Sequence, residues 1–307
     1  MFNLFLLQLL NGAQFGILLF LVAAGLTLVF GIMDFINLAH GVLYMVGAYL
    51  MASFAGMTGS YWFGLLLALP ATLVFGLVLE FLVFRRLYDR SHLDQVLATF
   101  GLILMLSEGV KILWGSAPLN VDMPALLSGS VPLAGPLKYP VYRIAVIAAG
   151  LASALGLWGL INHTRAGMLL RAGASNRPMV AALGVDISRL FMLVFAGGAM
   201  LAGFAGAIVA PILSVDPGMG ESILILTFVV IVIGGVGSIR GAFLAAILVG
   251  VVDTVGRVFG PIWLKLVMDP AAASQTGRML APMLVYLLMA AVLFWSPTGL
   301  FGRKGAK

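Results

Sequence analysis

The stretch Ile223-Leu224-Ile225-Leu226-Thr227-Phe228-Val229-Val230-Ile231 is apolar except for Thr227. A strand of an outer-membrane barrel alternates apolar and polar side chains, because one face meets lipid and the other meets the lumen. This stretch does not alternate, so it predicts a helix. The sequence therefore predicts an all-α, polytopic integral membrane protein with about 8–10 transmembrane helices, each of which needs about 20 apolar residues. The candidate spans are 9–32, 38–57, 62–84, 93–114, 141–161, 190–213, 222–237, 242–260 and 279–296.

The composition excludes several classes of protein. Hydrophobic residues make up 62% of the 307 residues and charged residues only 9%, whereas a soluble domain has about 25% charged residues. A soluble enzyme, a disordered chain and a nucleic-acid-binding module are therefore excluded. The chain contains no Cys, so disulfides and thiol chemistry are excluded as well. We expect a single transmembrane domain over residues 1–307.

Basic residues indicate the orientation of the chain in the membrane. Eleven of the 17 Lys and Arg residues lie in four segments, namely Arg85–Arg90, Arg165–Arg189, Arg240 and Arg303–Lys307. Because cytoplasmic loops carry the excess of Lys and Arg, we assign these segments to the cytoplasm and residues 116–140 to the outside. The N-terminus is then outside and the C-terminus cytoplasmic. The net charge of +6 is thus explained by topology rather than by nucleic acid.

Two segments break the apolar pattern with glycines and polar residues, at 31–41 and at 234–241. In hydrocarbon every backbone N–H and C=O needs a partner, so such broken helices or hairpins are tolerated only inside the protein or beside a water-filled cavity. Interrupted segments in corresponding positions of two halves are typical of transport proteins. Asn37 and His40 in the first break are therefore candidates for the translocation path. The alternative is that each break is an ordinary hairpin turn.

Small residues recur at helical spacing in two of the candidate spans. Ala199, Gly203 and Ala207 are each four residues apart, and Gly12 and Gly16 repeat the pattern near the N-terminus. Small residues on one face let helices approach closely in lipid, where packing rather than the hydrophobic effect holds them together. We interpret these residues as packing faces rather than ligands.

The few charged residues inside the spans have structural interpretations. The pairs Glu108–Lys111 and Asp253–Arg257 are spaced to meet on one helix face. Mutual neutralisation explains them, and the alternative is that they line a polar path. Glu80 lies about one turn before Arg85 and is interpreted as interfacial. No cluster of His, Asp and Glu predicts a metal site.

The longest cytoplasmic segment, residues 162–189, predicts a short helix. Ser175 or Asn176 can cap it, Pro178 suits its first turn, and Gly184 ends it. Its apolar stripe would consist of Met179, Ala182 and Leu183. A helix this small requires a groove in a partner. The alternative is a helix that lies in the membrane interface.

This segment and four further blocks together resemble a known family. The blocks are Gly25–Gly41, Phe195–Gly206, Gly234–Ala242 and Ser296–Arg303, and they occur in the family's order. They are similar to the permease subunits of branched-chain (hydrophobic) amino-acid ABC transporters of the Liv type, over essentially the whole chain. The chain departs from many relatives at Ala174-Ser175-Asn176, where they carry an acidic residue, and at Arg240, where they carry Pro.

The resemblance implies a permease subunit, in the bacterial plasma (inner) membrane, for the import of branched-chain or other hydrophobic amino acids. It also implies four partners: a second related permease subunit, two cytoplasmic ATPase subunits, and a periplasmic or extracellular solute-binding protein. Residues 162–189 would be the coupling loop seated on the ATPase. The residues implied in coupling are Arg171, Ala172, Ser175, Asn176, Ala181 and Gly184.

Other functions remain as alternatives. A neighbouring branch of the family serves urea, short amides or aromatic acids. A stand-alone channel or ion-coupled transporter would need acids inside the membrane, and only Glu108 and Asp253 are available, each with a basic neighbour. The sequence has no Gly-x-x-x-x-Gly-Lys-Ser/Thr loop and no hydrolase motif. We therefore expect the chain itself to be no enzyme and to need no cofactor.

Overall fold

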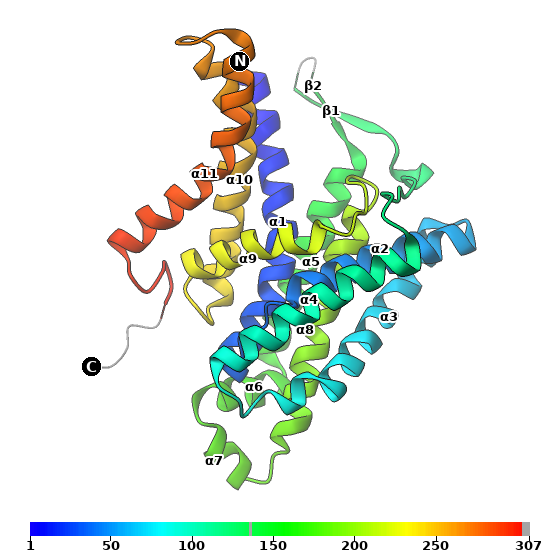
Figure 1. Ribbon diagram of the computed structural model, residues 1–307, viewed down its shortest axis with the longest axis vertical. Coiled ribbons are helices and arrows are strands. Elements are labelled where there is room, and N and C mark those ends of the chain that lie inside the picture. Colours follow the sequence, from blue (N-terminus) through cyan, green and yellow to red (C-terminus); the bar gives the residue numbers. More distant parts are fainter. Residues whose placement is uncertain (135–136, 303–307) are drawn as a thin grey trace. The chain divides into compact units, whose positions relative to one another are not determined.

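The computed structural model describes residues 1–134 and 137–302, without the side chains of Ala134 and Arg177. Arg303, Lys304 and Lys307, which the charge pattern assigns to the cytoplasm, lie outside the described residues. Figure 1 shows the helical elements. Their bounds are α1 (Phe2–Met33), α2 (His40–Thr58), α3 (Tyr61–Leu82), η1 (Phe84–Arg86), α4 (His92–Trp114), η2 (Ala125–Leu127), α5 (Val141–His163), α6 (Arg165–Ser175), α7 (Arg177–Ala182), α8 (Ile187–Val209), α9 (Met219–Gly234), α10 (Ile239–Leu264) and α11 (Pro270–Trp295).

Among the described residues, eight helices are long and apolar enough to cross a membrane: α1, α2, α3 with η1, α4, α5, α8, α10 and α11. The prediction of an all-α, polytopic membrane protein is confirmed. Helix α9 is apolar but has only 16 residues. At 1.5 Å per residue it spans about 24 Å, which is less than a hydrocarbon core of about 30 Å.

The chain divides into two compact units. Unit 1 comprises residues 1–20, 125–150 and 226 onward, and unit 2 comprises residues 21–124 and 151–225. Unit 2 holds α2, α3, α4, α6, α7 and α8, and unit 1 holds α10 and α11. The boundaries fall inside α1, α5 and α9, so each of these helices contributes residues to both units.

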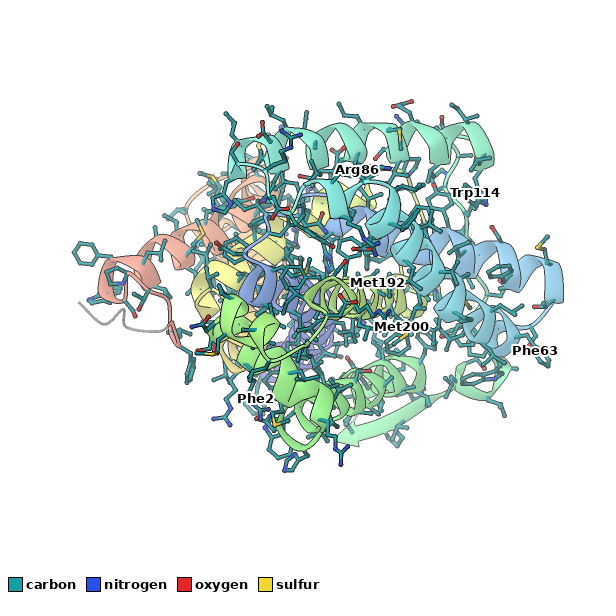
Figure 2. All side chains as sticks on the ribbon, turned by 90° about the horizontal axis from the view of Figure 1, so that it is seen from below. Phe2, Phe63, Arg86, Trp114, Met192 and Met200 are labelled. Carbon is teal, nitrogen blue, oxygen red and sulfur yellow. The ribbon has the colours of Figure 1, made fainter. Side chains whose placement is uncertain are left out.

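The main contact in unit 2 is between α2 and α8, and α3 packs against both of them. Gly47 of α2 lies directly on the backbone of Gly203 of α8, and Gly206 lies against the carbonyl of Tyr44. A side chain at either α8 glycine would collide with a neighbouring helix, so the prediction of a small-residue packing face is confirmed. Other apolar side chains of this unit are exposed, as at Phe63, which is 60% exposed (Figure 2).

Unit 1 uses the same kind of packing. Gly12 and Gly16 on α1 lie against the backbone of α10 at Val251 and Ala246. Helix α10 packs in turn along α11, where the Gly277 backbone lies on Pro261. The unit also carries a two-stranded antiparallel sheet of β1 (Ser130–Ala134) and β2 (Leu137–Pro140), with Ser130 opposite Pro140 (Figure 1).

Two elements differ from the sequence-based expectation. Residues 116–140, for which the sequence analysis predicts no secondary structure, contain the β1–β2 hairpin. Helix α11 begins at Pro270 rather than near residue 279. Asp269 caps it by accepting the N–H of Ala271, and Pro270 occupies the first turn. Capping therefore starts the helix before its apolar stretch begins.

Candidate functional site

The first break in the helical pattern is a short segment of unit 2, residues 34–39, which we call the first connector. It joins α1 to α2. Helix α1 ends because Asp34 adopts a left-handed conformation with φ of 51°, a conformation that Asp tolerates better than most non-glycine residues. The predicted break at 31–41 is thus confirmed, and the α1 and α2 helix ends lie inside it.

Side chains of α4 bind the backbone of the first connector. The N–H of Ile36 donates to Gln95 Oε1 at 3.2 Å, and the N–H of Leu38 donates to Thr99 Oγ1 at 3.3 Å. Gln95 in turn donates to the carbonyls of Leu87 and Arg90. Both side chains are buried, so they satisfy backbone groups that lipid could not. Sequence reasoning missed this pair, although two polar residues four apart in an apolar span are a usable signal.

Asn37 and His40 lie in the core of unit 2. Asn37 is 0% and His40 1% exposed. Among the described residues, neither the Asn37 amide nor the His40 ring nitrogens make a regular hydrogen bond. The His40 ring lies against the Val22 backbone and beside the contact of Gly25 with Gly198. Leaving such groups unpaired costs about 1–3 kcal/mol each, so they call for an explanation other than stability.

A pocket elsewhere in unit 2 does not supply that explanation. It has a volume of about 570 Å³ and lies between α2, α3 and α4. Its lining is apolar, from Val46 through Pro70 and Phe75 to Leu106 and Trp114. The Trp114 N–H already donates to Ser53 Oγ. The pocket therefore offers nothing to hold a charged or zwitterionic solute.

The second break, residues 235–238 of unit 1, joins α9 to α10, and we call it the second connector. Gly234 lies directly on Gly241, and Gly235, with φ of 95°, lies against Gly302. The N–H of Leu300 donates to the Ile233 carbonyl at 2.8 Å. This connector is a tight backbone turn, and the predicted break at 234–241 is confirmed.

The segment 162–189 forms two helices where the sequence indicated one. Thr164 caps α6 by accepting the N–H of Gly167, and Asn176 caps α7 by accepting the N–H of Met179 at 3.0 Å. The prediction of a cap at Ser175 or Asn176 is thus confirmed for Asn176. Gly184, with φ of 84°, follows α7 as predicted. Helix α6 was not predicted.

The residues implied in coupling all lie on this segment. Arg171 and Ala172 are on α6, Ser175 ends it, Asn176 precedes α7, Ala181 is on α7 and Gly184 follows it. The Arg171 guanidinium donates to the Ile161 carbonyl at the end of α5. Met179 is 58% and Leu183 76% exposed. The predicted apolar stripe therefore faces outward, with no covering helix among the described residues.

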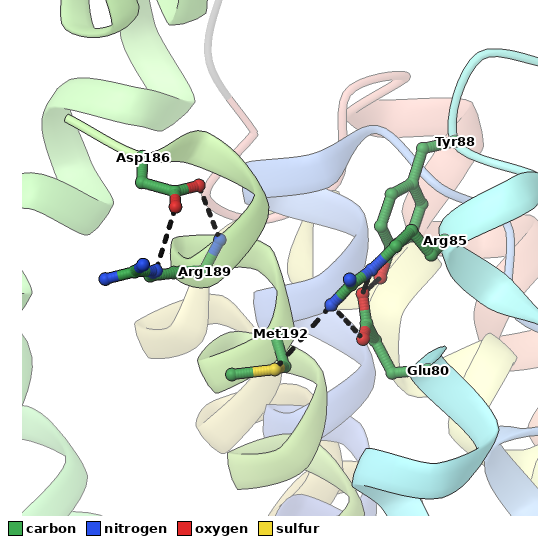
Figure 3. Close-up of polar contacts among 6 residues, drawn as sticks. All are labelled: Glu80, Arg85, Tyr88, Asp186, Arg189 and Met192. Atoms are coloured by element: carbon green, nitrogen blue, oxygen red, sulfur yellow. Dashed lines mark hydrogen bonds and ion pairs between the residues drawn. The ribbon is translucent and has the colours of Figure 1, made fainter. Parts of the chain in front are cut away.

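Glu80 makes contacts that the sequence did not indicate. It is 0% exposed, and it forms a salt bridge to Arg85 at 3.1 Å (Figure 3). Tyr88 donates to Glu80 Oε1 at 3.1 Å. The chain turns at η1, and this turn brings Arg85 and Tyr88 onto the Glu80 carboxylate. Burial, and then the Glu80 carboxylate, raise the pKa of Tyr88, so its hydroxyl remains a donor at neutral pH.

The other charged pairs are as predicted. Lys111 lies 2.6 Å from Glu108 on α4, and Arg257 lies 2.7 Å from Asp253 on α10. Within the described part of the chain, no group of three or more His, Asp or Glu side chains is placed to hold a metal ion.

Comparison with known proteins identifies the family. Residues 8–296 match the family described as "Branched-chain amino acid transport system / permease component". The chain is 30% identical to the high-affinity branched-chain amino acid transport system permease protein BraD of Pseudomonas aeruginosa, over 97% of this chain and 96% of that protein. It is 27% identical to the corresponding protein LivH of Escherichia coli, over 98% and 97%. It is also 24% identical to the ribose import permease protein RbsC of Escherichia coli, over 75% and 71%.

No solved structure matches the chain. The family match covers most of the sequence, and the helices have the length and composition of membrane spans. The chain is therefore a multi-pass membrane protein that belongs to the family of branched-chain amino acid transport system permease components.

Proposed function

We propose that the chain is the transmembrane permease subunit of an ATP-driven importer for branched-chain and other hydrophobic amino acids. The observation that carries this proposal is the end-to-end match to BraD, at 30% identity over 97% of this chain. A match over nearly the whole length of both chains supports a common mode of transport as well as a shared fold. The proposal treats residues 1–307 as one permease domain.

The partners follow from this proposal. A second related permease subunit completes the pore, two cytoplasmic ATPase subunits hydrolyse ATP, and a periplasmic or extracellular solute-binding protein delivers the amino acid. The chain has no phosphate-binding loop of its own. Hydrolysis is therefore assigned to the partner chains.

Helix α7 is the proposed contact with the ATPase. Its apolar residues Met179 and Leu183 are exposed, and a helix of 6 residues is too short to be stable without tertiary support. Asn176 and Gly184 fix its two ends. A small rigid helix with an open apolar face suits insertion into a groove of a partner.

Asn37 and His40 are the proposed polar groups of the translocation path. A transported amino acid is a zwitterion, so its path needs polar side chains and open helix ends rather than apolar walls. The unpaired Asn37 amide and the His40 imidazole, whose polar contact is with the Val22 backbone, lie beside the ends of α1 and α2 and have this character. Both are enclosed, so the described conformation corresponds to a closed path.

The proposed location is the bacterial plasma (inner) membrane, with the N-terminus outside and the C-terminus cytoplasmic. The excess of Lys and Arg in residues 162–189 and 85–90 supports this orientation. Ser175→Cys and Ser128→Cys are a matched pair, because both serines are exposed and the chain has no other thiol. An impermeant thiol reagent should label only position 128 in intact spheroplasts. Labelling of position 175 alone would reverse the orientation.

The test of function is uptake by the complete complex in proteoliposomes. We expect ATP-dependent accumulation of labelled leucine, isoleucine and valine when the binding protein is present. Competition by urea, short amides or aromatic acids, with no effect of branched-chain amino acids, would assign the chain to the alternative branch. Uptake without ATP, driven by an ion gradient, would replace the proposal by an ion-coupled transporter.

Coupling through α7 is tested in the same assay. Ala181→Arg and Gly184→Trp should abolish uptake and weaken retention of the ATPase, because both place bulk at the exposed docking surface. Leu126→Arg is the control. Leu126 is 82% exposed, similar to Leu183 in the coupling loop, but it lies in the segment assigned to the outside. Full uptake by both loop variants would remove the coupling role of α7.

A further inference from the structure

Glu80 is a fully buried carboxylate that the proposed function does not use. It accepts three hydrogen bonds, from Arg85 Nε at 3.3 Å, from Arg85 Nη2 at 3.1 Å and from the Tyr88 hydroxyl at 3.1 Å. The Arg85 side chain retains 38% exposure, and its guanidinium also lies over the Phe81 ring at 5.2 Å. We call Glu80, Arg85 and Tyr88 the Glu80 cluster. Glu80 lies in the last turn of α3, Arg85 in η1 and Tyr88 just after η1.

Stability does not account for the Glu80 cluster. Removing a carboxylate from water costs free energy that its partners only partly return, and apolar side chains of similar size often stabilise a protein equally well. What a satisfied buried polar cluster does provide is one defined arrangement of the elements that it joins. The elements joined by the Glu80 cluster therefore indicate its role.

One side of the cluster contacts α8. Arg85 Nη2 lies 3.7 Å from the Met192 sulfur (Figure 3), and the Tyr88 ring meets Phe191 edge to face at 5.4 Å. Phe191 and Met192 are in the first turns of α8, which follows directly on the proposed coupling loop. Asp186 caps this end of α8 by accepting the N–H of Arg189 at 3.1 Å. Movement of α7 would therefore reach Arg85 and Tyr88 through residues 183–186 and the capped first turns of α8.

The other side of the cluster contacts the first connector. The Tyr88 ring meets Phe35 edge to face at 5.7 Å, and Phe35 meets Phe84 of η1 at 5.6 Å. The Phe84 ring also packs on the ring of Phe195, which lies one turn after Phe191 on α8, with 4.4 Å between the ring centroids. Phe35 is 0% exposed, so it cannot move without its aromatic neighbours. Asn37 follows it by two residues.

We propose that Glu80, Arg85 and Tyr88 are positioning residues, which hold the first turns of α8 and the first connector in one fixed arrangement. A shift of the coupling loop then moves the connector that carries Asn37 and His40. This inference rests on the proposed function, since it assigns to the Glu80 cluster the link between ATP hydrolysis and the path. Coupling between distant sites is carried by packed side chains and hydrogen-bond networks, and the Glu80 cluster supplies both between α8 and the first connector.

The test compares uptake per ATP hydrolysed in the reconstituted complex. The triple variant Glu80→Leu, Arg85→Met, Tyr88→Phe removes both charges and the hydroxyl together, so no buried group is left unpaired. We expect it to assemble and to hydrolyse ATP, and to lose about tenfold in uptake per ATP. A ratio within about twofold of the unmodified chain would overturn the inference.

Two further variants complete the design. Glu108→Leu with Lys111→Met removes a salt bridge on α4 that touches neither α8 nor the connector, and its ratio should stay unchanged. Tyr88→Phe keeps every ring contact and removes one hydrogen bond. If the triple variant fails to assemble, Tyr88→Phe decides the matter: a ratio lowered severalfold supports the role, and an unchanged ratio overturns it.

A reporter independent of transport separates this inference from the proposed function. Ile36→Cys places the only thiol of the chain at a partly exposed position of the first connector. Gly184→Trp in the coupling loop should change the rate at which that thiol reacts with a maleimide. The change should vanish in the triple variant. If the complex takes up no amino acid but this coupling is present, the proposed function has failed and the positioning role stands.

Discussion

The two connectors interrupt the helical pattern in similar ways, but different parts of the chain hold them. In the first connector, side chains of α4 bind the backbone, through Gln95 and Thr99. In the second, backbone holds backbone, since Gly234 lies on Gly241 and the Ile233 carbonyl accepts the Leu300 N–H. The first also encloses polar groups without a regular hydrogen bond at Asn37 and His40, whereas the second is a turn of glycines.

The two connectors differ in whether their backbone contacts can be exchanged for others. A backbone N–H bound by a side chain can exchange that partner for another when a rotamer changes, without loss of helix. A turn closed by glycine contacts has no such alternative, because its geometry is set by the absence of Cβ atoms. We therefore interpret the first connector as a segment that can move, together with α8, and the second as a rigid turn of unit 1.

The largest effect is expected for a substitution of Gly241, which lies directly on Gly234 at the second connector. A Cβ there would meet the Gly234 carbonyl oxygen, and one at Gly234 would lie 2.5 Å from the Gly241 carbonyl carbon. Gly241→Val should therefore force α9 and α10 apart and cost about 3 kcal/mol or more. We expect loss of assembled complex, measured by size-exclusion chromatography in detergent.

Gly260→Ala on the same helix is the matched control for this change. Its Cβ would find Gly277 at 3.6 Å, an ordinary contact, so assembly should be retained. Normal assembly of Gly241→Val would show that the second connector tolerates rearrangement, and the contrast between the connectors would collapse.

The next effect is on transport rather than assembly. Asn37→Leu and His40→Leu remove buried groups that have no regular hydrogen bond, so the midpoint of thermal unfolding should hold or rise. Uptake should nevertheless fall severalfold, because the proposed path loses its polar groups, while ATP hydrolysis continues. Leucine uptake, ATPase activity and the unfolding midpoint are measured on the same preparations.

Ser238→Ala is the control in the second connector. It removes the cap of α10, where Ser238 accepts the N–H of Gly241 at 3.1 Å, and should cost about 1 kcal/mol. Uptake per assembled complex should stay normal. If Asn37→Leu and His40→Leu transport normally, or if they fail to assemble, these residues belong to the packing and the path lies elsewhere.

The smallest effect is expected for Arg240→Pro. Arg240 is exposed in the first turn of α10, where a helix needs no N–H and Pro is well tolerated. The unfolding midpoint should move by less than about 2 °C, and leucine uptake should be unchanged. A loss of uptake as large as that of Asn37→Leu would make the second connector a functional site too.

Features set by local spacing could be predicted from the sequence. The two breaks, the Asn176 cap and the Glu108–Lys111 pair each depend on residues a few positions apart. The apolar runs likewise predict the spans, because length and composition decide whether a helix can cross lipid. Helix α11 was placed too late, since its start depends on Asp269 rather than on hydropathy.

The candidate site was less predictable, because its contacts join distant parts of the chain. Gln95 meets the backbone of Ile36 from 59 positions away, and no pattern within one span indicates that partner. The burial of Glu80 was missed for a similar reason. The turn at η1 brings Arg85 and Tyr88 onto its carboxylate, and Phe84 and Tyr88 pack on aromatic residues of α8. Hydropathy records none of these contacts.

The contact of α2 with α8 limits which amino-acid substitutions this chain can accept during evolution. Gly47 and Gly203 meet backbone to backbone, and Thr72 of α3 closes the same point. Every coded substitution at either glycine adds atoms, and the opposite residue cannot shrink to make room. Most core contacts can drift by paired exchanges of large and small side chains. No such paired exchange is open to Gly47 and Gly203, so neither residue can be replaced without moving α8 away from α2 or α3.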